Sequence, residues 1–215
     1  MLSKFGIIFV STALLMSLAL VYFSSIEVKN SNNVIPKKIY KFSLLQLTFS
    51  VLSFIILVVG YVFSDFSIIN VYENSHTTKP LFYKISGTWG NHEGSLLLWI
   101  NILVLFSFLF LFLNKNGNKN FKIFTLLFQN LLIVFFFIFL LTTSNPFSTI
   151  YPIPAEGMGL NPILQDPALA IHPPLLYVGF VGSSIYFSAA LSALVSKIDA
   201  KSLAISIKPW VLISW

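Results

Sequence analysis

Histidines are the residues of this chain best suited to metal or proton chemistry. Its 215 residues include three of them, His76, His92 and His172, and no cysteine. A neutral imidazole can ligate a metal ion or haem iron, and it exchanges protons near neutral pH. Without cysteine, any other ligand must be nitrogen, oxygen or thioether. The residue types alone single out no catalytic residue.

His172 comes directly before Pro173, Pro174 and an apolar run. Proline restricts the residue before it and is common in the first turn of a helix, so we expect His172 at or near a helix N-cap. There the positive end of the helix dipole disfavours imidazolium, and the neutral ring could donate a lone pair to a metal. An axial haem ligand needs this property. A histidine that only caps a helix is equally consistent with the pattern.

His92 lies in a glycine-rich segment, 87–94, which also contains Trp89 and Glu93. The glycines would let the backbone turn tightly while Trp89 sits at the membrane surface. We expect a helix to begin near Ser95, and Glu93 beside its first turn would favour the helix dipole. A structural role thus explains Glu93. His92 is either a residue for ligation or catalysis or only a side chain at the membrane interface.

The composition is that of an integral membrane protein. Hydrophobic residues make up 56% of the chain and charged residues 9%, and the mean hydropathy is +0.85. Soluble proteins are about a quarter charged, and a helix of about 20 apolar residues crosses a bilayer. The sequence therefore predicts an all-α integral membrane protein, a polytopic helical bundle in one membrane domain, 1–215. It has five complete spans, at about 5–23, 42–63, 95–113, 123–141 and 175–195, and the start of a sixth at 209.

The lysines predict how the bundle is oriented. All thirteen basic residues are lysine, and ten of them lie in the segments 24–41, 114–122 and 196–208, which we expect to be the inner loops. The Asn- and Lys-rich stretch 114–122 is expected to be a solvated loop. Because cytoplasmic loops retain positive charge, the N-terminus is expected outside, with outward loops 64–94 and 142–173 that hold all three histidines. A bacterial cytoplasmic membrane or a mitochondrial inner membrane would give this pattern, and we favour the bacterial one.

Polar groups inside the five predicted spans are amides rather than charges. No Asp, Glu, Lys or His lies within them, whereas ion-coupled carriers usually need such groups at depth, so transport is disfavoured. Gln46, Asn101, Gln129 and Asn130 could line a substrate path, but hydrogen bonds between helices are the favoured explanation.

Three longer motifs occur in order along the chain: Trp89-Gly90-Asn91-His92-Glu93-Gly94-Ser95-Leu96-Leu97-Leu98-Trp99, Pro154-Ala155-Glu156-Gly157-Met158-Gly159-Leu160-Asn161-Pro162-Ile163-Leu164-Gln165-Asp166-Pro167 and His172-Pro173-Pro174-Leu175-Leu176-Tyr177. Together they resemble the amino-terminal part of the CcmF family of cytochrome c maturation proteins, a haem-handling family that also includes NrfE and CcsA. The segments 83–86 and 208–210 are similar to that family as well.

The resemblance implies a component of the cytochrome c haem lyase, or holocytochrome c synthetase, which handles haem on the outer face of the membrane for covalent attachment to apocytochrome c. The family holds haem between two external histidines over a Trp-rich motif, and His172 matches the first of the two. The implied cofactor is haem, b-type before attachment, with its iron held through His172. Trp89, His92, Glu93 and Asp166 are further candidates for the haem or substrate side of the outer loops.

The implied partners are membrane lipid, a CcmE-like haem chaperone, CcmH- and CcmI-like proteins that present the apocytochrome, apocytochrome c and the remainder of the CcmF-like protein; no nucleic acid is expected. The family's Trp-rich motif, second external histidine and two membrane histidines have no counterpart in this sequence. We therefore expect the chain, as a split subunit or a truncated fragment, to be inactive alone. The alternative functions are a haem or small-molecule transport subunit and a structural subunit of a respiratory membrane assembly.

Overall fold

The computed structural model of the chain describes residues 1–30, 34–114 and 118–215, and this part of the chain is helical. Within these residues the only β pairing is an isolated bridge between Ile68 and Thr149. In chain order the helices are α1 (Leu2–Glu27), α2 (Lys37–Val62), α3 (Ile69–Asn74), α4 (Leu81–Gly87), α5 (His92–Leu113), α6 (Lys119–Thr143), the 3-10 helix η1 (Pro162–Leu164), α7 (Pro167–Phe180), α8 (Ser184–Ser196) and α9 (Ala200–Ser214).

Five helical segments of the described chain are long and apolar enough to cross a membrane, which confirms the predicted all-α membrane fold. Four of them are single helices, α1, α2, α5 and α6, and they coincide with the first four predicted spans to within a few residues at each end. The fifth, Pro167–Ser196, consists of α7 and α8 together.

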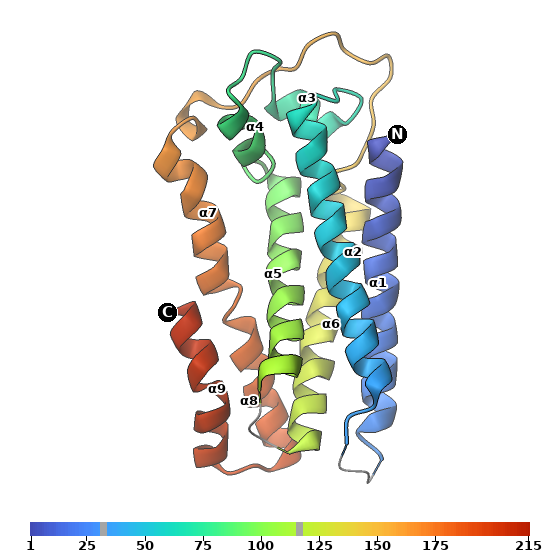
Figure 1. Ribbon diagram of the computed structural model, residues 1–215, viewed down its shortest axis with the longest axis vertical. Coiled ribbons are helices and arrows are strands. Elements are labelled where there is room, and N and C mark those ends of the chain that lie inside the picture. The colour runs from blue at the N-terminus through green and yellow to red at the C-terminus, as the bar shows by residue number, and fades with distance from the viewer. Residues whose placement is uncertain (31–33, 115–117) are drawn as a thin grey trace.

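The long helices stand side by side (Figure 1). Their buried apolar residues form one large cluster and a smaller second one. α1 packs against α2 and α6, α5 packs against α2 and α6, and α8 packs against α6. The N-terminus, α3, α4 and the beginning of α7 lie at the upper end in Figure 1, and the α8–α9 connection lies at the lower end. The histidine-bearing segments and the lysine-rich segments are therefore at opposite ends of the bundle.

The fifth predicted span, 175–195, is wrong at its start, because α7 already begins at Pro167. Asp166 caps this helix, and its Oδ1 accepts hydrogen bonds of 2.8 and 3.1 Å from two N–H groups of the first turn. Pro167 fits the first turn, where its missing N–H has no helical acceptor. The predicted loop 142–173 therefore ends at the cap. His172, predicted at an N-cap, lies in the second turn of α7, and the two prolines after it are inside the helix.

A turn, 181–183, interrupts the fifth span between α7 and α8. At its centre, a Cβ on Gly182 would overlap the carbonyl of Val178 and the ring of Phe106. Glycine is therefore needed because the neighbouring atoms leave no room for a side chain. The uniform apolar run of the sequence thus contains two helical halves rather than one continuous helix.

The predicted sixth span corresponds to α9, which also begins earlier than predicted, at Ala200 instead of 209. The reason is again an aspartate cap, since Asp199 accepts a 3.0 Å hydrogen bond from the N–H of Ser202. The predicted start, Pro209, lies inside α9, and the following Trp210 is buried against aromatic rings of α5.

The amides of the spans hold helices together, as the sequence predicts. The Nε2 of Gln46 on α2 donates to Ser17 on α1 at 2.7 Å and to Asn130 on α6 at 2.8 Å. Gln129 on α6 is hydrogen-bonded to two serines of α8. Asn101 differs, because its side chain donates to a backbone carbonyl of its own helix. Hydrogen bonds of this kind align apolar helices that have little hydrophobic drive to associate in lipid.

One lysine-rich segment, 114–122, departs from the expected solvated loop. Its last four residues form the first turn of α6. The side chain of Lys119 is 5% exposed, and its Nζ lies 2.6 Å from an Oε of Glu27 on α1. Lys115 lies outside the described residues. A lysine at this end therefore contributes to packing as well as to the charge pattern.

Candidate functional site

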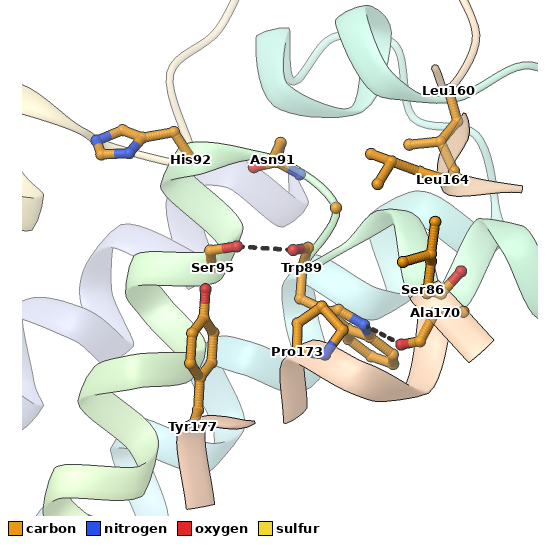
Figure 2. A pocket seen from close by; sticks show the side chains of 12 residues that line it. Ser86, Trp89, Asn91, His92, Ser95, Leu160, Leu164, Ala170, Pro173 and Tyr177 are labelled. Carbon is orange, nitrogen blue, oxygen red and sulfur yellow. Dashed lines mark hydrogen bonds between the residues drawn. The ribbon is translucent and has the colours of Figure 1, made fainter. Parts of the chain in front are cut away.

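A cavity of about 360 Å³ opens at the upper end between the α4–α5 turn, α5 and α7 (Figure 2). Three stretches of the chain, 86–95, 160–164 and 169–177, line it. The lining residues are Ser86, Trp89, Gly90, Asn91, His92, Ser95, Leu160, Leu164, Leu169, Ala170, Pro173 and Tyr177. The last four lie on one face of α7, because residues three or four apart along a helix share a face. The cavity thus joins the three sequence motifs in one place.

Trp89 forms the wall between the α4–α5 turn and α7. Its Nε1 donates a 2.8 Å hydrogen bond to the backbone carbonyl of Ala170, as Figure 2 shows. Its own carbonyl accepts a 2.7 Å hydrogen bond from the hydroxyl of Ser95. The indole ring also stacks on Phe54 of α2, with centroids 6.4 Å apart. Trp89 is therefore held from both sides and contacts the turn of α7 that precedes His172.

Asn91 organises the turn into α5. As N-cap it accepts a 2.8 Å hydrogen bond from the N–H of Gly94. Its Oδ1 also accepts from the amide of Asn70, at 2.7 Å, and that amide donates to a carboxylate oxygen of Glu93 at 3.0 Å. Tyr61, at the end of α2, donates to Asn70 and accepts from Asn91. This network joins α2, α3 and α5, so the predicted structural explanation of Glu93 agrees with its contacts.

His92 lies on the border of the cavity. Its Nε2 is 3.1 Å from the hydroxyl of Ser144 at the end of α6, and Figure 2 shows the ring turned away from Trp89 and Pro173. The same residue also lines a second, more apolar cavity of about 250 Å³ with Ser95, Leu96, Trp99, Phe136 and Tyr177. His92 thus borders both cavities, as do Ser95 and Tyr177, and the second cavity continues along α5.

His172 faces elsewhere. It is exposed on α7 and is not among the residues that line these two cavities. Its neighbours on that face, Ile171, Leu175 and Leu176, are apolar and at least half exposed. No hydrogen bond or ion pair from the described residues reaches its imidazole. The helix dipole acts mainly on the first turn, whereas His172 lies in the second turn of α7. The dipole effect expected at a helix N-cap therefore does not apply to His172. The arrangement presents an imidazole with free nitrogens on an apolar surface.

The other predicted residues divide between two roles. Trp89 and His92 contact the cavity, whereas Asp166 is the N-cap of α7. The sequence reasoning did not single out Ser95 or Tyr177, which also line the cavity. The spacing of Ala170, Pro173 and Tyr177 would have indicated a shared helix face, but only if α7 had been predicted from Pro167.

His76 lies in a set of polar contacts between the segments 64–94 and 142–166. Its Nδ1 is 3.0 Å from the hydroxyl of Thr78 and 3.8 Å from a carboxylate oxygen of Glu156. Hydrogen bonds from the hydroxyl and N–H of Thr77 lower the pKa of Glu156 to about 2. The carboxylate therefore stays ionised at neutral pH and joins segment 64–94 to segment 142–166.

Among the described residues, none of the three histidines belongs to a group of three or more potential metal ligands. Within residues 1–30, 34–114 and 118–215, no group of three or more His, Cys, Asp or Glu side chains is placed to hold a metal ion. A haem iron differs from a bare ion because the porphyrin supplies four ligands and the protein only the axial ones. His172, with its free imidazole, could supply one axial ligand.

Comparison with known proteins gives consistent matches. A family model described as cytochrome C assembly protein matches residues 89–215. The cytochrome c-type biogenesis protein CycK of Rhizobium meliloti (strain 1021) is 50% identical over 164 residues, which is 76% of this chain and 24% of CycK. CcmF of Escherichia coli (strain K12) is 40% identical over 164 residues, 76% of this chain and 25% of CcmF.

The fold is shared with a solved structure. Cytochrome c heme lyase CcmF superposes with a TM-score of 0.83 at 23% identity, over 100% of this chain and 34% of that chain. At this identity the likeness establishes the fold alone. The chain spans about a quarter of the length of the curated relatives that it matches.

Proposed function

Since this chain belongs to the cytochrome c assembly protein family, we propose that it is a component of the cytochrome c haem lyase. It handles haem on the outer face of the membrane, where the haem is attached covalently to apocytochrome c. The observation that carries the proposal is the exposed imidazole of His172, which has no hydrogen-bond partner among the described residues and lies on an apolar helix face.

Haem is the substrate in this function, and α7 offers the chemistry to hold it. His172 supplies one axial nitrogen to the iron. Ile171, Leu175 and Leu176, which flank it, suit the apolar faces of a porphyrin. The chain has no cysteine, so the thiols that become attached to haem come from the apocytochrome. The role of this chain is therefore to bind and orient haem.

The remaining ligands and surfaces come from partners. The chain works with the remainder of the CcmF-like protein, which supplies the second axial histidine and the Trp-rich surface. A CcmE-like chaperone delivers haem, and CcmH- and CcmI-like proteins present the apocytochrome. Alone, the chain binds haem weakly and does not complete the ligation. The single free imidazole on α7 supports this division of labour.

The bundle lies in the bacterial cytoplasmic membrane with the N-terminus and the cavity outside. Ten of the thirteen lysines fall in the three segments expected at the cytoplasmic side. The short helices α3 and α4 and the beginning of α7 gather at the opposite end of the bundle (Figure 1). His172 therefore faces the side on which apocytochromes receive haem.

Replacement of His172 by alanine tests the proposal. The chain is co-expressed with the polypeptide that supplies the rest of the lyase, and haem retained by the complex and holocytochrome yield are measured. We expect His172→Ala to lower haem retention by about tenfold or more, since even loss of outer partners of a metal site costs about 10–100-fold. Added imidazole should partly restore the haem spectrum, because the substituted side chain is exposed.

His76→Ala is the matched control. His76 is also an upper-end histidine, but it is hydrogen-bonded to Thr78 and lies beside Glu156, so its loss should leave haem retention near the wild-type level. Unchanged haem retention and holocytochrome yield in His172→Ala would refute the ligand role.

A further inference from the structure

Two consecutive prolines inside α7 leave the helix short of backbone donors. Pro173 and Pro174 have no N–H, so the carbonyls four residues earlier, at Leu169 and Ala170, lose their usual helical partners. Unpaired carbonyls are costly in an apolar environment. Ala170 is buried, with 5% of its surface exposed. This position therefore needs a donor from outside the helix.

Trp89 supplies that donor. Its indole N–H meets the carbonyl of Ala170 at 2.8 Å, the group that residue 174 would pair with if it were not proline. The contact is not a general property of tryptophans in this bundle. Trp99 lies on α5 and lines the second cavity. Its indole N–H is buried without a hydrogen-bond partner among the described residues.

The hydrogen bond has consequences for the position of α7. Among the described residues, this helix makes sparse contacts with the other helices, the most extensive of them with α4, α5 and α9. Trp89 itself is fixed by the hydroxyl of Ser95 and by stacking on Phe54. His172 lies between Ala170 and the prolines, in the same turn that the indole holds. A kink or rotation at the prolines would therefore move the imidazole relative to the rest of the bundle.

We propose that Trp89 is a positioning residue whose indole N–H replaces the backbone N–H that Pro174 lacks and so orients the turn of α7 that carries His172. This inference rests on the proposed haem-binding role of His172. It assigns to one hydrogen bond the link between Trp89 of the first motif and the turn of α7 that leads into the third motif. Trp89 does not itself contact the iron.

A double-mutant cycle tests the pairing directly. Trp89→Phe keeps an aromatic ring but removes the N–H, whereas Pro174→Ala returns a backbone N–H to the carbonyl of Ala170. In the complex with the rest of the lyase, we expect Trp89→Phe to lower haem retention by about tenfold, as for a buried acceptor left unpaired. In Trp89→Phe/Pro174→Ala, haem retention should return to the level of Pro174→Ala alone.

Trp99→Phe is the matched control, since it removes an indole N–H that has no hydrogen-bond partner in the described part of the chain. Pro174→Ala should not relieve any effect of Trp99→Phe. The haem absorption spectrum serves as a second readout, because a displaced His172 changes the axial coordination of the iron and a simple loss of protein does not.

Thermal unfolding of the same variants separates the inference from the proposed function. We expect Trp89→Phe to lower the melting temperature by about 3 °C in the wild type and by much less in Pro174→Ala. Additive thermal effects would overturn the compensation between Trp89 and Pro174. A second outcome is that the melting temperatures are non-additive while the haem spectrum of Trp89→Phe is unchanged. If His172→Ala still loses haem, that outcome would overturn only the positioning role of Trp89. If His172→Ala retains haem, both the proposed function and the positioning role fail.

Discussion

Single side chains at the upper end pair with backbone groups that the local chain leaves unsatisfied. Asn91 and Asp166 accept from the free N–H groups at the starts of α5 and α7, and Trp89 donates to a carbonyl beside the prolines of α7. Helix ends and proline positions always leave such groups, and burial makes them costly. These three residues therefore determine where the helices begin and how they approach one another.

Gly94 also determines how the start of α5 packs, but by its lack of a side chain and not by a hydrogen bond. It lies in the first turn of α5, and a Cβ there would overlap the backbone carbonyl of Thr88. Its φ is not in the left-handed region. The glycine is therefore required by the close approach of the α4–α5 turn, and not by the tight backbone turn that the sequence suggested.

The variant Gly94→Ala distinguishes helix propensity from steric overlap, because the two effects change the free energy of unfolding in opposite directions. Helix propensity alone would stabilise the protein by about 1 kcal/mol, whereas the overlap with Thr88 should lower the free energy of unfolding by about 1–3 kcal/mol. We expect the loss, measured by thermal unfolding in detergent. Gly90→Ala is the control, because the nearest atom to its added methyl is the end of the Leu160 side chain at 3.3 Å. A stabilised Gly94→Ala variant would contradict the close approach.

At the scale of the elements, polar contacts fix how apolar helices are paired. The Gln46 amide joins α1, α2 and α6 in the middle of the bundle. Near its lower end, Glu27 of α1 and Lys119 of α6 form a buried ion pair in which each side chain is 5% exposed. Lys119 also donates to the carbonyl of Asn30 just after α1. The pair therefore holds the lower ends of two helices that are distant in sequence.

Breaking this ion pair should cost more than removing both of its charges. Lys119→Met leaves the Glu27 carboxylate buried without its cation, and we expect a loss of about 3–5 kcal/mol in the free energy of unfolding. In Glu27→Gln/Lys119→Met the uncompensated charge is gone, so much of that loss should be recovered. Chemical denaturation in detergent measures both. Lys201→Met, at an exposed lysine, should change stability by less than about 0.5 kcal/mol. An equal effect at Lys201 would show that the burial of Lys119 is unimportant.

At the scale of the whole molecule, chemistry and charge are separated along the bundle axis. The helices α3 and α4 and the beginning of α7 lie at one end of the bundle, and the connections that hold most of the lysines lie at the other (Figure 1). The segments at the first end carry the three histidines and line the cavity. This polarity matches the inside–outside asymmetry that membrane insertion imposes on lysines. It also means that a single measurement of orientation decides on which side of the membrane His172 works.

The chain contains no cysteine, so one engineered cysteine reports its own side of the membrane. We expect Ile153→Cys, at a position 60% exposed in the upper segment, to react with a membrane-impermeant maleimide in intact cells. Lys201→Cys, at the lower end, should react only after permeabilisation. The cysteine-free chain is the control. The reverse labelling pattern would overturn the proposed orientation and place His172 on the cytoplasmic side.

The sequence by itself determined the properties that depend on local composition. Apolar runs of about 20 residues predict the spans wherever they occur, and the structure places the first four as expected. Amides inside such runs must find partners, so the roles of Gln46, Gln129 and Asn130 also followed. The outer motifs were recognisable because their residue types are unusual between apolar helices.

Only the tertiary structure decided the course of α7 and the surroundings of its histidine. A pair of prolines normally indicates a helix start, but α7 continues through them while Trp89, far away in sequence, pairs with the carbonyl of Ala170. Similarly, the ring of Phe106, together with the carbonyl of Val178, leaves no room for a side chain at Gly182, where α7 and α8 are separated. Such contacts join residues that are distant along the chain, and no local pattern contains them. Together with the local Asp166 cap that starts α7 at Pro167, they turn His172 from a predicted helix cap into an exposed side chain on an apolar helix face.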